Sequence, residues 1–233
     1  MDAVVPAAGA GTRLRPLTAD RPKGLVEVAD RPLLAHVFET LVASGVDRLV
    51  VVCGYRGEQI RAHFGATYRE TPIEYVWQTE RRGLGHAVYQ AREVVEGPFV
   101  VLNGDNVVAG TLNRPIDRFR THSATAVVAT ETVAPEVART TGVVQTTDDQ
   151  VKSIVEKPED PPGTRITTGC YVLLPAIFDA IAATRPAATG EIELPHAIDR
   201  LAATKPVLAV PLAADRVNVN TPADIDAAEA LLA

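Results

Sequence analysis

The architecture of this chain follows from one stretch near its start: Asp2-Ala-Val-Val-Pro-Ala-Ala-Gly-Ala-Gly-Thr-Arg-Leu-Arg-Pro-Leu-Thr-Ala-Asp-Arg-Pro-Lys23. The apolar run at 3–5 predicts a short buried strand, and the small residues after it predict a turn. Gly9 and Gly11 can adopt positive φ and carry no Cβ, so the backbone N–H groups of the turn can close around a phosphate or a base edge. The alternative is a strand-to-helix turn that needs glycine for steric reasons alone.

Two basic residues, Arg13 and Lys23, stand just behind this turn. Cationic side chains in that position suit a polyphosphate. The turn is nevertheless neither of the two common phosphate-binding loops. No Lys-Ser/Thr pair follows its glycines, as G-x-x-x-x-G-K-[ST] requires, and Leu14 occupies the last glycine position of G-x-G-x-x-G.

The composition bounds the class of protein. The chain has 233 residues, 46% of them hydrophobic, and a net charge of −6. This length allows one large α/β domain or two small ones. The mild negative charge, without a basic cluster, argues against a nucleic-acid partner. Cys53 and Cys170 lie in apolar runs and are expected to be buried thiols. With neither a leader pattern nor a membrane-length apolar segment, we expect a cytoplasmic protein that does not bind membranes.

The hydrophobic periodicity predicts two consecutive βαβ units with parallel strands. The first unit comprises a strand over 3–5, a helix over 33–42 and a strand over 49–53. The second comprises a helix near 57–64, a strand over 73–77, a helix over 85–95 and a strand over 99–102. Later apolar runs predict strands at 125–130, 142–145, 151–155, 170–174 and 207–210, with helices at 116–121, 176–183, 194–203 and from Pro222. Thr221 is a plausible N-cap of the last helix, and Asp224 suits its first turn. One α/β domain over 1–233 is therefore predicted, with mixed strands in its second half.

Ligands of open parallel sheets bind beyond the carboxyl ends of the strands. Four segments are expected there: 6–13, 78–87, 103–106 and 216–221. Gln78 can offer a donor and an acceptor to a base edge. Gly83 and Gly85 open a helix whose N-terminus favours anionic groups. Asp105 is a magnesium candidate if phosphates lie nearby, although a lone carboxylate there is more often a turn former or a helix cap.

Other polar residues give weaker signals on their own. Glu156 and Lys157 close a strand with adjacent opposite charges, for which a solvated strand end is the simpler explanation. The five histidines show neither metal-ligand spacing nor a Ser/His/Asp order. No nucleophile is evident, which is consistent with a reaction whose nucleophile is already ionised.

Taken in order, these segments resemble the sugar nucleotidyltransferase family, the sugar-1-phosphate pyrophosphorylases. The first piece, Ala8-Gly-Ala-Gly-Thr-Arg13 with Arg21-Pro-Lys23, is similar to the family's G-x-G-T-R…P-K motif. The further pieces are Val28-Ala-Asp-Arg-Pro-Leu-Leu34, Gln78 with Gly83-Leu-Gly-His-Ala87, Asn103-Gly-Asp-Asn106, Gly142-Val-Val144, Glu156-Lys-Pro158, Thr168-Gly-Cys-Tyr171, Gly190-Glu-Ile-Glu-Leu194 and Asn218-Val-Asn-Thr-Pro222. The resemblance spans nearly the whole chain.

The resemblance implies a single Rossmann-like α/β domain with a central mixed, mostly parallel sheet flanked by helices. Its nucleotide-binding half would cover about 1–110 and its sugar-phosphate-binding half about 111–233. The implied reaction joins a nucleoside triphosphate and a sugar 1-phosphate, giving a nucleotide sugar and pyrophosphate, with Mg²⁺ as cofactor. The sugar phosphate is a dianion near neutral pH and can attack the α-phosphorus without a general base, so alignment and charge neutralisation would carry catalysis.

The resemblance also implies roles for individual residues. Arg13 would hold the β- and γ-phosphates, Lys23 the α-phosphate, and Asp105 the metal together with Asn218. The nucleotide-binding set is Ala7, Ala8, Gly9, Gly11, Thr12, Arg13, Gln78 and Gly83. The sugar-phosphate-binding set is Asn106, Gly142, Glu156, Lys157 and Thr168, with Lys157 toward the phosphate and Glu156 toward the hydroxyls.

Two departures from the family pattern affect the expected chemistry. Asn218 stands at the position of the second metal ligand, which is usually Asp in the family. The family's N-acetylglucosamine-1-phosphate uridylyltransferases also have an Asn there. Its carbonyl oxygen can ligate but carries no charge, so weaker Mg²⁺ binding is expected. Pro6 replaces the usual Leu before Ala-Ala-Gly, a form similar to bacterial UTP–glucose-1-phosphate uridylyltransferases, which favours UTP.

Several alternatives stay open at this level. The nucleotide is UTP or dTTP, glucose 1-phosphate is the expected sugar, and a homo-oligomer is one possible state. A non-catalytic regulatory subunit that binds nucleotide sugars is the competing function, although retention of Arg13, Lys23, Asp105 and Lys157 argues against it. A dinucleotide-dependent oxidoreductase lacks both the G-x-G-x-x-G motif and a suitably placed acidic residue.

Overall fold

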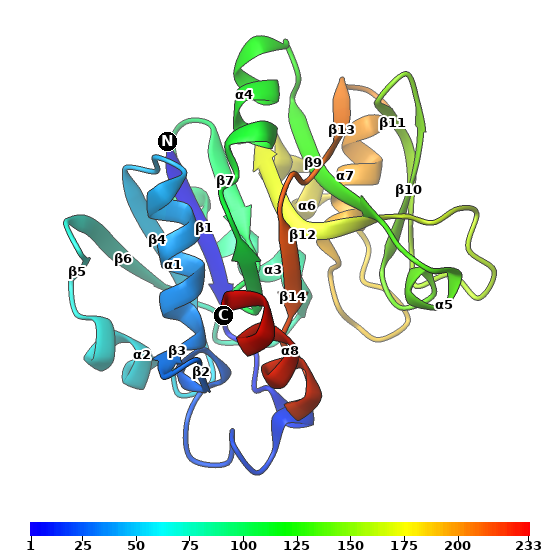
Figure 1. Ribbon diagram of the computed structural model, residues 1–233. Coiled ribbons are helices and arrows are strands. Elements are labelled where there is room, and N and C mark those ends of the chain that lie inside the picture. The colour runs from blue at the N-terminus through cyan, green and yellow to red at the C-terminus, as the bar shows by residue number, and fades with distance from the viewer. The chain divides into compact units, whose positions relative to one another are not determined.

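The N-terminal βαβ pattern is confirmed in the computed structural model, which describes residues 1–233 (Figure 1). Strands β1 (Asp2–Ala7), β4 (Arg48–Cys53) and β6 (Thr71–Trp77) run parallel in that order, and β5 (Thr67–Tyr68) pairs antiparallel with β6 at the edge. Helix α1 (Leu33–Ala43) connects β1 to β4, and α2 (Gly57–Phe64) follows β4. The nearly continuous apolar runs of β1 and β4 are buried, as expected of parallel strands covered on both faces.

Two compact units make up the chain, and each gathers segments that are distant in sequence. The first contains Met1–Arg81, Leu102–Leu112 and Ala213–Ala233, and the second contains Arg82–Val101 and Asn113–Leu212. The predicted nucleotide-binding and sugar-phosphate-binding halves, divided at about residue 110, stay a prediction, and the two compact units are divided differently. Residues 82–101 belong with the second unit, and the C-terminal residues 213–233 return to the first.

The C-terminal segment enters the first unit as a hairpin strand and a helix. Strand β14 (Asp215–Asn218) pairs antiparallel with β8 (Asn106–Ala109) in a two-stranded sheet of their own. The prediction that 216–221 follows a strand of the parallel sheet is therefore wrong. Strand β14 is half exposed and lacks the apolar run that is typical of a buried parallel strand. A second small hairpin joins β2 (Glu27–Val28) and β3 (Arg31–Pro32). Helix α8 (Pro222–Leu232) begins where predicted, after its N-cap Thr221.

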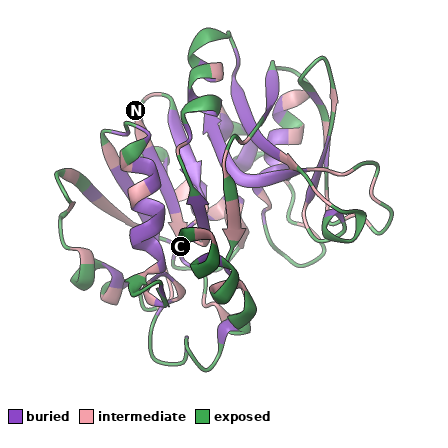
Figure 2. Ribbon diagram, viewed as in Figure 1, coloured by how far each residue is buried: buried purple, intermediate pink, exposed green.

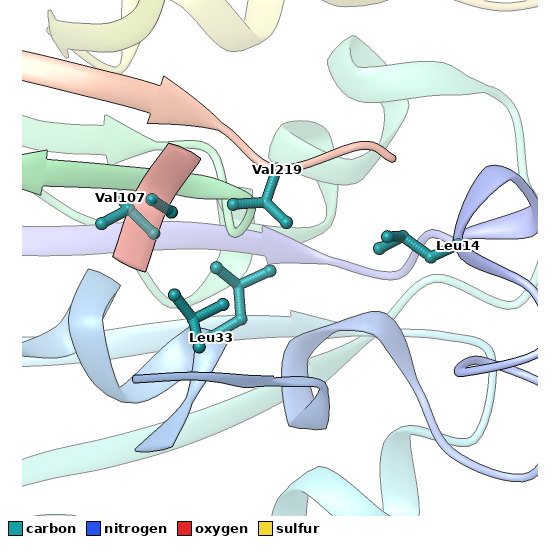
Figure 3. Close-up of a cluster of buried hydrophobic side chains, with 6 residues drawn as sticks. Leu14, Leu33, Val107 and Val219 are labelled. Carbon is teal, nitrogen blue, oxygen red and sulfur yellow. The ribbon is translucent and has the colours of Figure 1, made fainter. Parts of the chain in front are cut away.

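The helices of the first unit differ in how far they are buried. Figure 2 shows α1 almost entirely buried and α8 mostly exposed. Ala228 is the buried residue of α8, and it packs in a cluster with Leu14, Leu33, Val107 and Val219, completed by Val28. In this cluster, drawn in Figure 3, side chains from four remote parts of the chain converge. Burial of these side chains stabilises the convergence by about 1.5–3 kcal/mol for each large apolar residue.

The second unit is built on a mixed sheet. Its strands are β7 (Phe99–Leu102), β9 (Ala126–Thr132), β10 (Gly142–Thr147), β11 (Gln150–Glu156), β12 (Arg165–Leu173) and β13 (Val207–Pro211). Strand β9 pairs parallel with β13 and antiparallel with β12, while β10 pairs antiparallel with both β11 and β12. The helices are α3 (Gly83–Tyr89), α4 (Asn113–Thr121), α5 (Pro135–Ala138), α6 (Ala176–Ala182) and α7 (Leu194–Ala202). The predicted α/β class with a mixed sheet is confirmed.

Two element boundaries in the second unit differ from the periodicity-based predictions. Strand β12 begins at Arg165 rather than at residue 170, because Thr167 and Thr168 are buried in it without contributing an apolar signal. The helix predicted over 85–95 is α3, which ends at Tyr89 and continues as a 3₁₀ turn, Gln90–Glu93. Throughout the chain, no helix combines the length and the apolar character needed to span a membrane.

Candidate functional site

The glycine-rich turn after β1 is shaped by Gly11. Its φ is +59°, and a Cβ there would lie 2.9 Å from Cβ of Lys23. The carbonyl oxygen of Gly11 accepts hydrogen bonds from the Thr18 hydroxyl at 2.8 Å and from the Leu14 amide at 2.9 Å. Gly9, by contrast, has a negative φ and open space where a Cβ would stand. The steric requirement for glycine therefore applies to Gly11, which allows Lys23 to pack against the turn.

A charged cluster gathers beside this turn in the first unit. Lys23 Nζ donates to Asp105 Oδ2 at 2.7 Å and to Asn220 Oδ1 at 2.9 Å. Arg13 Nη2 donates to the same Asn220 oxygen at 2.8 Å. The Asn218 amide lies against the Asp105 carboxylate, with its nitrogen 2.9 Å from Oδ1 and its oxygen 3.2 Å from Asn220 Nδ2. The structure thus brings together the four residues that were predicted to act on the nucleotide phosphates and the metal: Arg13, Lys23, Asp105 and Asn218.

The position of Asp105 depends on a close backbone approach. Gly104 N donates to the Pro6 carbonyl oxygen at 3.1 Å, and a Cβ on Gly104 would lie 2.6 Å from that oxygen. The Asp105 carbonyl oxygen in turn accepts from Val219 N at 2.9 Å. Asp105 is therefore fixed between the end of β1 and the C-terminal segment. The Asp105 side chain is 25% exposed, which leaves it accessible to a ligand.

The buried cluster in Figure 3 explains why these remote residues meet. Leu14 follows Arg13, Val107 lies two positions after Asp105, and Val219 separates Asn218 from Asn220. Each of these three buried side chains is thus at most two residues from a polar residue of the charged cluster. Apolar packing beneath the site positions the charged side chains above it.

A capping box at the start of α8 holds Asn220. The Asp224 carboxylate accepts from Asn220 N at 2.8 Å, Thr221 N at 2.7 Å and the Thr221 hydroxyl at 2.9 Å. Burial alone would raise the pKa of Asp224, but these hydrogen bonds outweigh it and hold the pKa below its ordinary value of 3.8. Ionised Asp224 therefore stabilises the fold, and that contribution is lost as the pH falls through the lowered pKa.

We expect Asp224→Ala to lower the free energy of unfolding at pH 7 by about 1 kcal/mol, because it removes the capping box. Urea unfolding of the variant and the parent protein measures this difference, which should narrow below pH 3.8 as Asp224 is protonated. Asp226→Ala is the matched control, since Asp226 is exposed on the same helix. An equal loss in both variants would contradict the capping role.

The donor set at Asp105 and Asn218 suits a hard divalent cation. A carboxylate and an amide carbonyl are both oxygen donors, and turning the Asn218 amide presents its oxygen beside Asp105 Oδ1. The chain contains no group of three or more His, Cys, Asp or Glu side chains arranged to hold a metal. A Mg²⁺ ion there would take its remaining ligands from water and phosphate, as this ion commonly does.

A second charged group, Glu156, Lys157 and Glu193, lies in the second unit. Lys157 Nζ is 3.4 Å from Glu156 Oε1 and 3.6 Å from Glu193 Oε1. Burial raises the pKa of Glu156, and the nearby Lys157 only partly offsets this. Burial would lower the pKa of Lys157, but the carboxylates of Glu193 and Glu156 outweigh it and the pKa rises. Lys157 is therefore held protonated, and its φ of +46° is uncommon for a residue with a side chain.

The remaining members of the predicted sugar-phosphate set lie in different surroundings. Gly142 pairs with Glu156 across β10 and β11, and a Cβ on Gly142 would lie 2.9 Å from Glu156 Oε2. Thr168 is buried, and its hydroxyl donates to the Ala129 carbonyl oxygen at 3.0 Å. Asn106, however, lies in the first unit, buried at the start of β8, and accepts from Arg216 Nη1 at 3.1 Å. The structure therefore places Asn106 with the Asp105 cluster.

The predicted nucleotide-binding residues are divided between the units. Ala7 ends β1, Ala8 follows it buried, Thr12 opens a short 3₁₀ turn that includes Arg13, and buried Gln78 follows β6. Gly83 opens α3 in the second unit, with a φ of +89°. A Cβ on Gly83 would lie 2.9 Å from the Ile192 carbonyl oxygen, so packing against residues 191–192 already requires this glycine.

Two residues that the sequence did not single out contribute to these clusters: Asn220 and Glu193. The spacing of Thr221 and Asp224 matches a capping box. The Asp224 carboxylate of this box also accepts a hydrogen bond from the Asn220 backbone N–H. Nothing in the local sequence indicates that Asn220 contacts Arg13, which is 207 positions away, or that Glu193 contacts Lys157.

Comparison with known proteins shows which proteins this chain is similar to. Residues 2–214 match the nucleotidyl transferase family. The chain is 41% identical over 231 residues to a UTP–glucose-1-phosphate uridylyltransferase from Haloferax volcanii, a match that covers 98% of this chain and 95% of that protein. A structure of UDP-glucose pyrophosphorylase complexed with UDP-glucose superposes with a TM-score of 0.90 and 25% identity, covering 98% and 97% of the two chains. A UTP-bound UDP-glucose pyrophosphorylase from Acinetobacter baumannii gives a TM-score of 0.87 and 26% identity, covering 98% and 92%.

The chain therefore belongs to the nucleotidyl transferase family. The enzyme class expected from the sequence, a sugar-1-phosphate nucleotidyltransferase, is confirmed.

Proposed function

We propose that this enzyme joins UTP and glucose 1-phosphate to give UDP-glucose and pyrophosphate. The observation that carries the proposal is the convergence of Arg13, Lys23 and Asp105 beside the glycine turn, with Lys23 Nζ 2.7 Å from the carboxylate. Lys23 contacts the carboxylate directly and Arg13 joins the cluster through Asn220, so the two cations and the carboxylate supply the groups needed to bind a triphosphate and a divalent metal. Similarity to the Haloferax volcanii uridylyltransferase over 98% of the chain supports UTP and glucose 1-phosphate as substrates.

The proposed reaction is an in-line attack by the sugar phosphate on the α-phosphorus, which expels pyrophosphate. The second pKa of a phosphate monoester is near 6, so the attacking oxygen is already anionic at neutral pH and needs no general base. The chain's task is then to align the reactants and to neutralise charge. Lys23 would stabilise the α-phosphoryl oxygens as charge develops, and Arg13 would hold the leaving β- and γ-phosphates.

Mg²⁺ is the proposed cofactor, held by Asp105 and Asn218. When bound, it would supply positive charge that offsets the negative charge developing on the phosphates. Because Asn218 adds no negative charge, binding of the ion should depend more strongly on the nucleotide phosphates than it would with two carboxylates. Ala8, Gln78 and Gly83 are proposed to contact the base, and Gly142, Glu156, Lys157 and Thr168 to contact the sugar phosphate. A homo-oligomer stays a prediction, as does a cytoplasmic location.

A matrix of nucleotides and sugar phosphates tests the proposal. Pyrophosphate release would be measured for UTP, dTTP, ATP and GTP, each with glucose 1-phosphate, galactose 1-phosphate, mannose 1-phosphate and N-acetylglucosamine 1-phosphate, in the presence of Mg²⁺. The highest kcat/KM is expected for UTP with glucose 1-phosphate. Higher values with dTTP would overturn the nucleotide assignment. Nucleotide binding without any pyrophosphate release would support a non-catalytic regulatory subunit instead.

We expect Lys157→Ala to raise KM for the sugar 1-phosphate by about 30-fold, because it removes a charge-assisted contact and leaves two carboxylates facing a dianion. KM for the nucleotide should change little. Steady-state kinetics with each substrate varied in turn measure both constants. Lys152→Ala is the matched control, because Lys152 is an exposed lysine on β11, the strand that ends just before Lys157. Equal effects on the two KM values would argue against a specific role for Lys157.

A further inference from the structure

Asn220 presents one oxygen to two cationic side chains. Its Oδ1 accepts from Arg13 Nη2 at 2.8 Å and from Lys23 Nζ at 2.9 Å. Both donors are positively charged, so they repel each other when they converge on one point. A shared acceptor offsets this repulsion with two charge-assisted hydrogen bonds. Asn220 therefore holds the two cations closer together than they would stay by themselves.

The Asn220 side chain is itself fixed by its surroundings. Its backbone N–H donates a hydrogen bond to Asp224 Oδ2 at 2.8 Å, beside the capping box of α8. The residue before it, Val219, is fully buried. The amide nitrogen, Nδ2, lies 3.5 Å from the Asn218 carbonyl oxygen, on the side away from the cations. With the nitrogen on that side, the oxygen faces Arg13 and Lys23.

The amide is neutral, and this distinguishes it from the carboxylates nearby. Asp105 already neutralises one positive charge through its ion pair with Lys23. An aspartate at position 220 would neutralise the second charge and leave the cluster without net attraction for an anion. An asparagine accepts the same two hydrogen bonds and leaves the positive charge available to a phosphate group.

We propose that Asn220 is a positioning residue that preforms a two-cation clamp for the diphosphate portion of the nucleotide and for the pyrophosphate that leaves. This proposal rests on the proposed function insofar as Arg13 and Lys23 act on a triphosphate. Asn220 sets the separation of the two cations across the phosphoanhydride bond before the nucleotide arrives. Preorganisation of this kind removes part of the ordering cost from the binding and the reaction.

Binding of inorganic pyrophosphate to the whole protein tests the clamp without nucleotide or sugar. Isothermal titration calorimetry would compare the parent protein with Asn220→Ala and Asn220→Asp, with and without Mg²⁺. We expect Asn220→Ala to weaken pyrophosphate binding by about tenfold, in line with the loss of hydrogen bonds to charged groups. We expect Asn220→Asp to weaken it further, because the new carboxylate competes with the ligand for both cations. Asn113→Ala, an exposed asparagine of the second unit, is the control.

The relative pyrophosphate affinities of the two variants distinguish the clamp from a packing role. Aspartate has nearly the size and shape of asparagine, so a residue needed only for packing would tolerate Asp better than Ala. A smaller loss in Asn220→Asp than in Asn220→Ala would therefore overturn the proposal, as would affinities in both variants equal to the parent. Urea unfolding of each variant verifies that it is folded, and if the alanine variant is not, the aspartate variant carries the test. Failure to release pyrophosphate from any substrate pair would overturn the proposed function and leave the binding result standing.

Discussion

Asp105→Ala is expected to reduce turnover by at least about 1,000-fold, since stabilisation of transition-state charge by a bound metal is worth several kcal/mol. Asp105 is the one carboxylate in the proposed metal pair, and its partner Asn218 cannot replace the charge. The substitution also removes the ion pair at 2.7 Å that holds Lys23 beside it. Two groups proposed to act on the α-phosphate would thus be affected by one change.

The fold should survive this substitution. Asp105 is tied into the unit through its backbone, whose carbonyl oxygen accepts from Val219 N, and that bond does not depend on the side chain. Turnover would be measured by pyrophosphate release and stability by urea unfolding. Asp105→Asn keeps the shape and serves as an isosteric comparison, and Asp20→Ala removes a carboxylate that is 80% exposed near the same turn. Near-normal turnover in Asp105→Ala would refute the metal assignment.

The parts of the fold that sequence reasoning predicted well depend on local information. The apolar periodicity of α1 and the apolar runs of β1 and β4 arise from neighbouring residues, and the structure contains these elements within a few positions of the prediction. The start of α8 was predicted for the same reason. An N-cap threonine with an aspartate three positions later satisfies the free N–H groups of a helix by itself.

The parts that sequence reasoning missed depend on contacts between remote residues. Strand β14 is short and half exposed, and its partner β8 lies about a hundred positions earlier, so no local pattern marks either as a hairpin strand. Nor does any pattern reveal that an asparagine near the C-terminus accepts from Arg13. A resemblance to a family can order the known motifs along the chain. It does not show which neighbouring residues position them.

The glycines illustrate the same limit at the level of single residues. Gly9 and Gly11 are equivalent in the sequence pattern, yet only Gly11 has positive φ and a neighbour, Lys23, that would clash with a Cβ. Gly83 was predicted to lie beside the base, whereas the structure reveals a packing requirement against residues 191–192. A glycine motif therefore indicates close approach without identifying what approaches.

Lys23→Ala is expected to lower kcat by about 300-fold while KM for the nucleotide changes by less than tenfold, because loss of a preorganised group that stabilises transition-state charge typically costs 10²–10³ in turnover. The Lys23 side chain is only 14% exposed and is held from two sides, by Asp105 and by Asn220. Its ammonium group is thus already in place before substrate binds. A triphosphate would still be bound by Arg13, so the ground state should lose less than the transition state.

Two measurements separate these effects. Titration of UTP in the absence of sugar phosphate reports ground-state binding, and single-turnover formation of the nucleotide sugar reports the chemical step. Lys205→Ala, an exposed lysine of the second unit, is the control for loss of a positive charge. Lys23→Arg should not restore the rate, because a planar guanidinium cannot occupy the position of a point charge that donates to both Asp105 and Asn220. If Lys23→Ala weakened UTP binding as much as it slowed the chemical step, the lysine would contribute uniform binding, and its assignment to the α-phosphate in the transition state would be wrong.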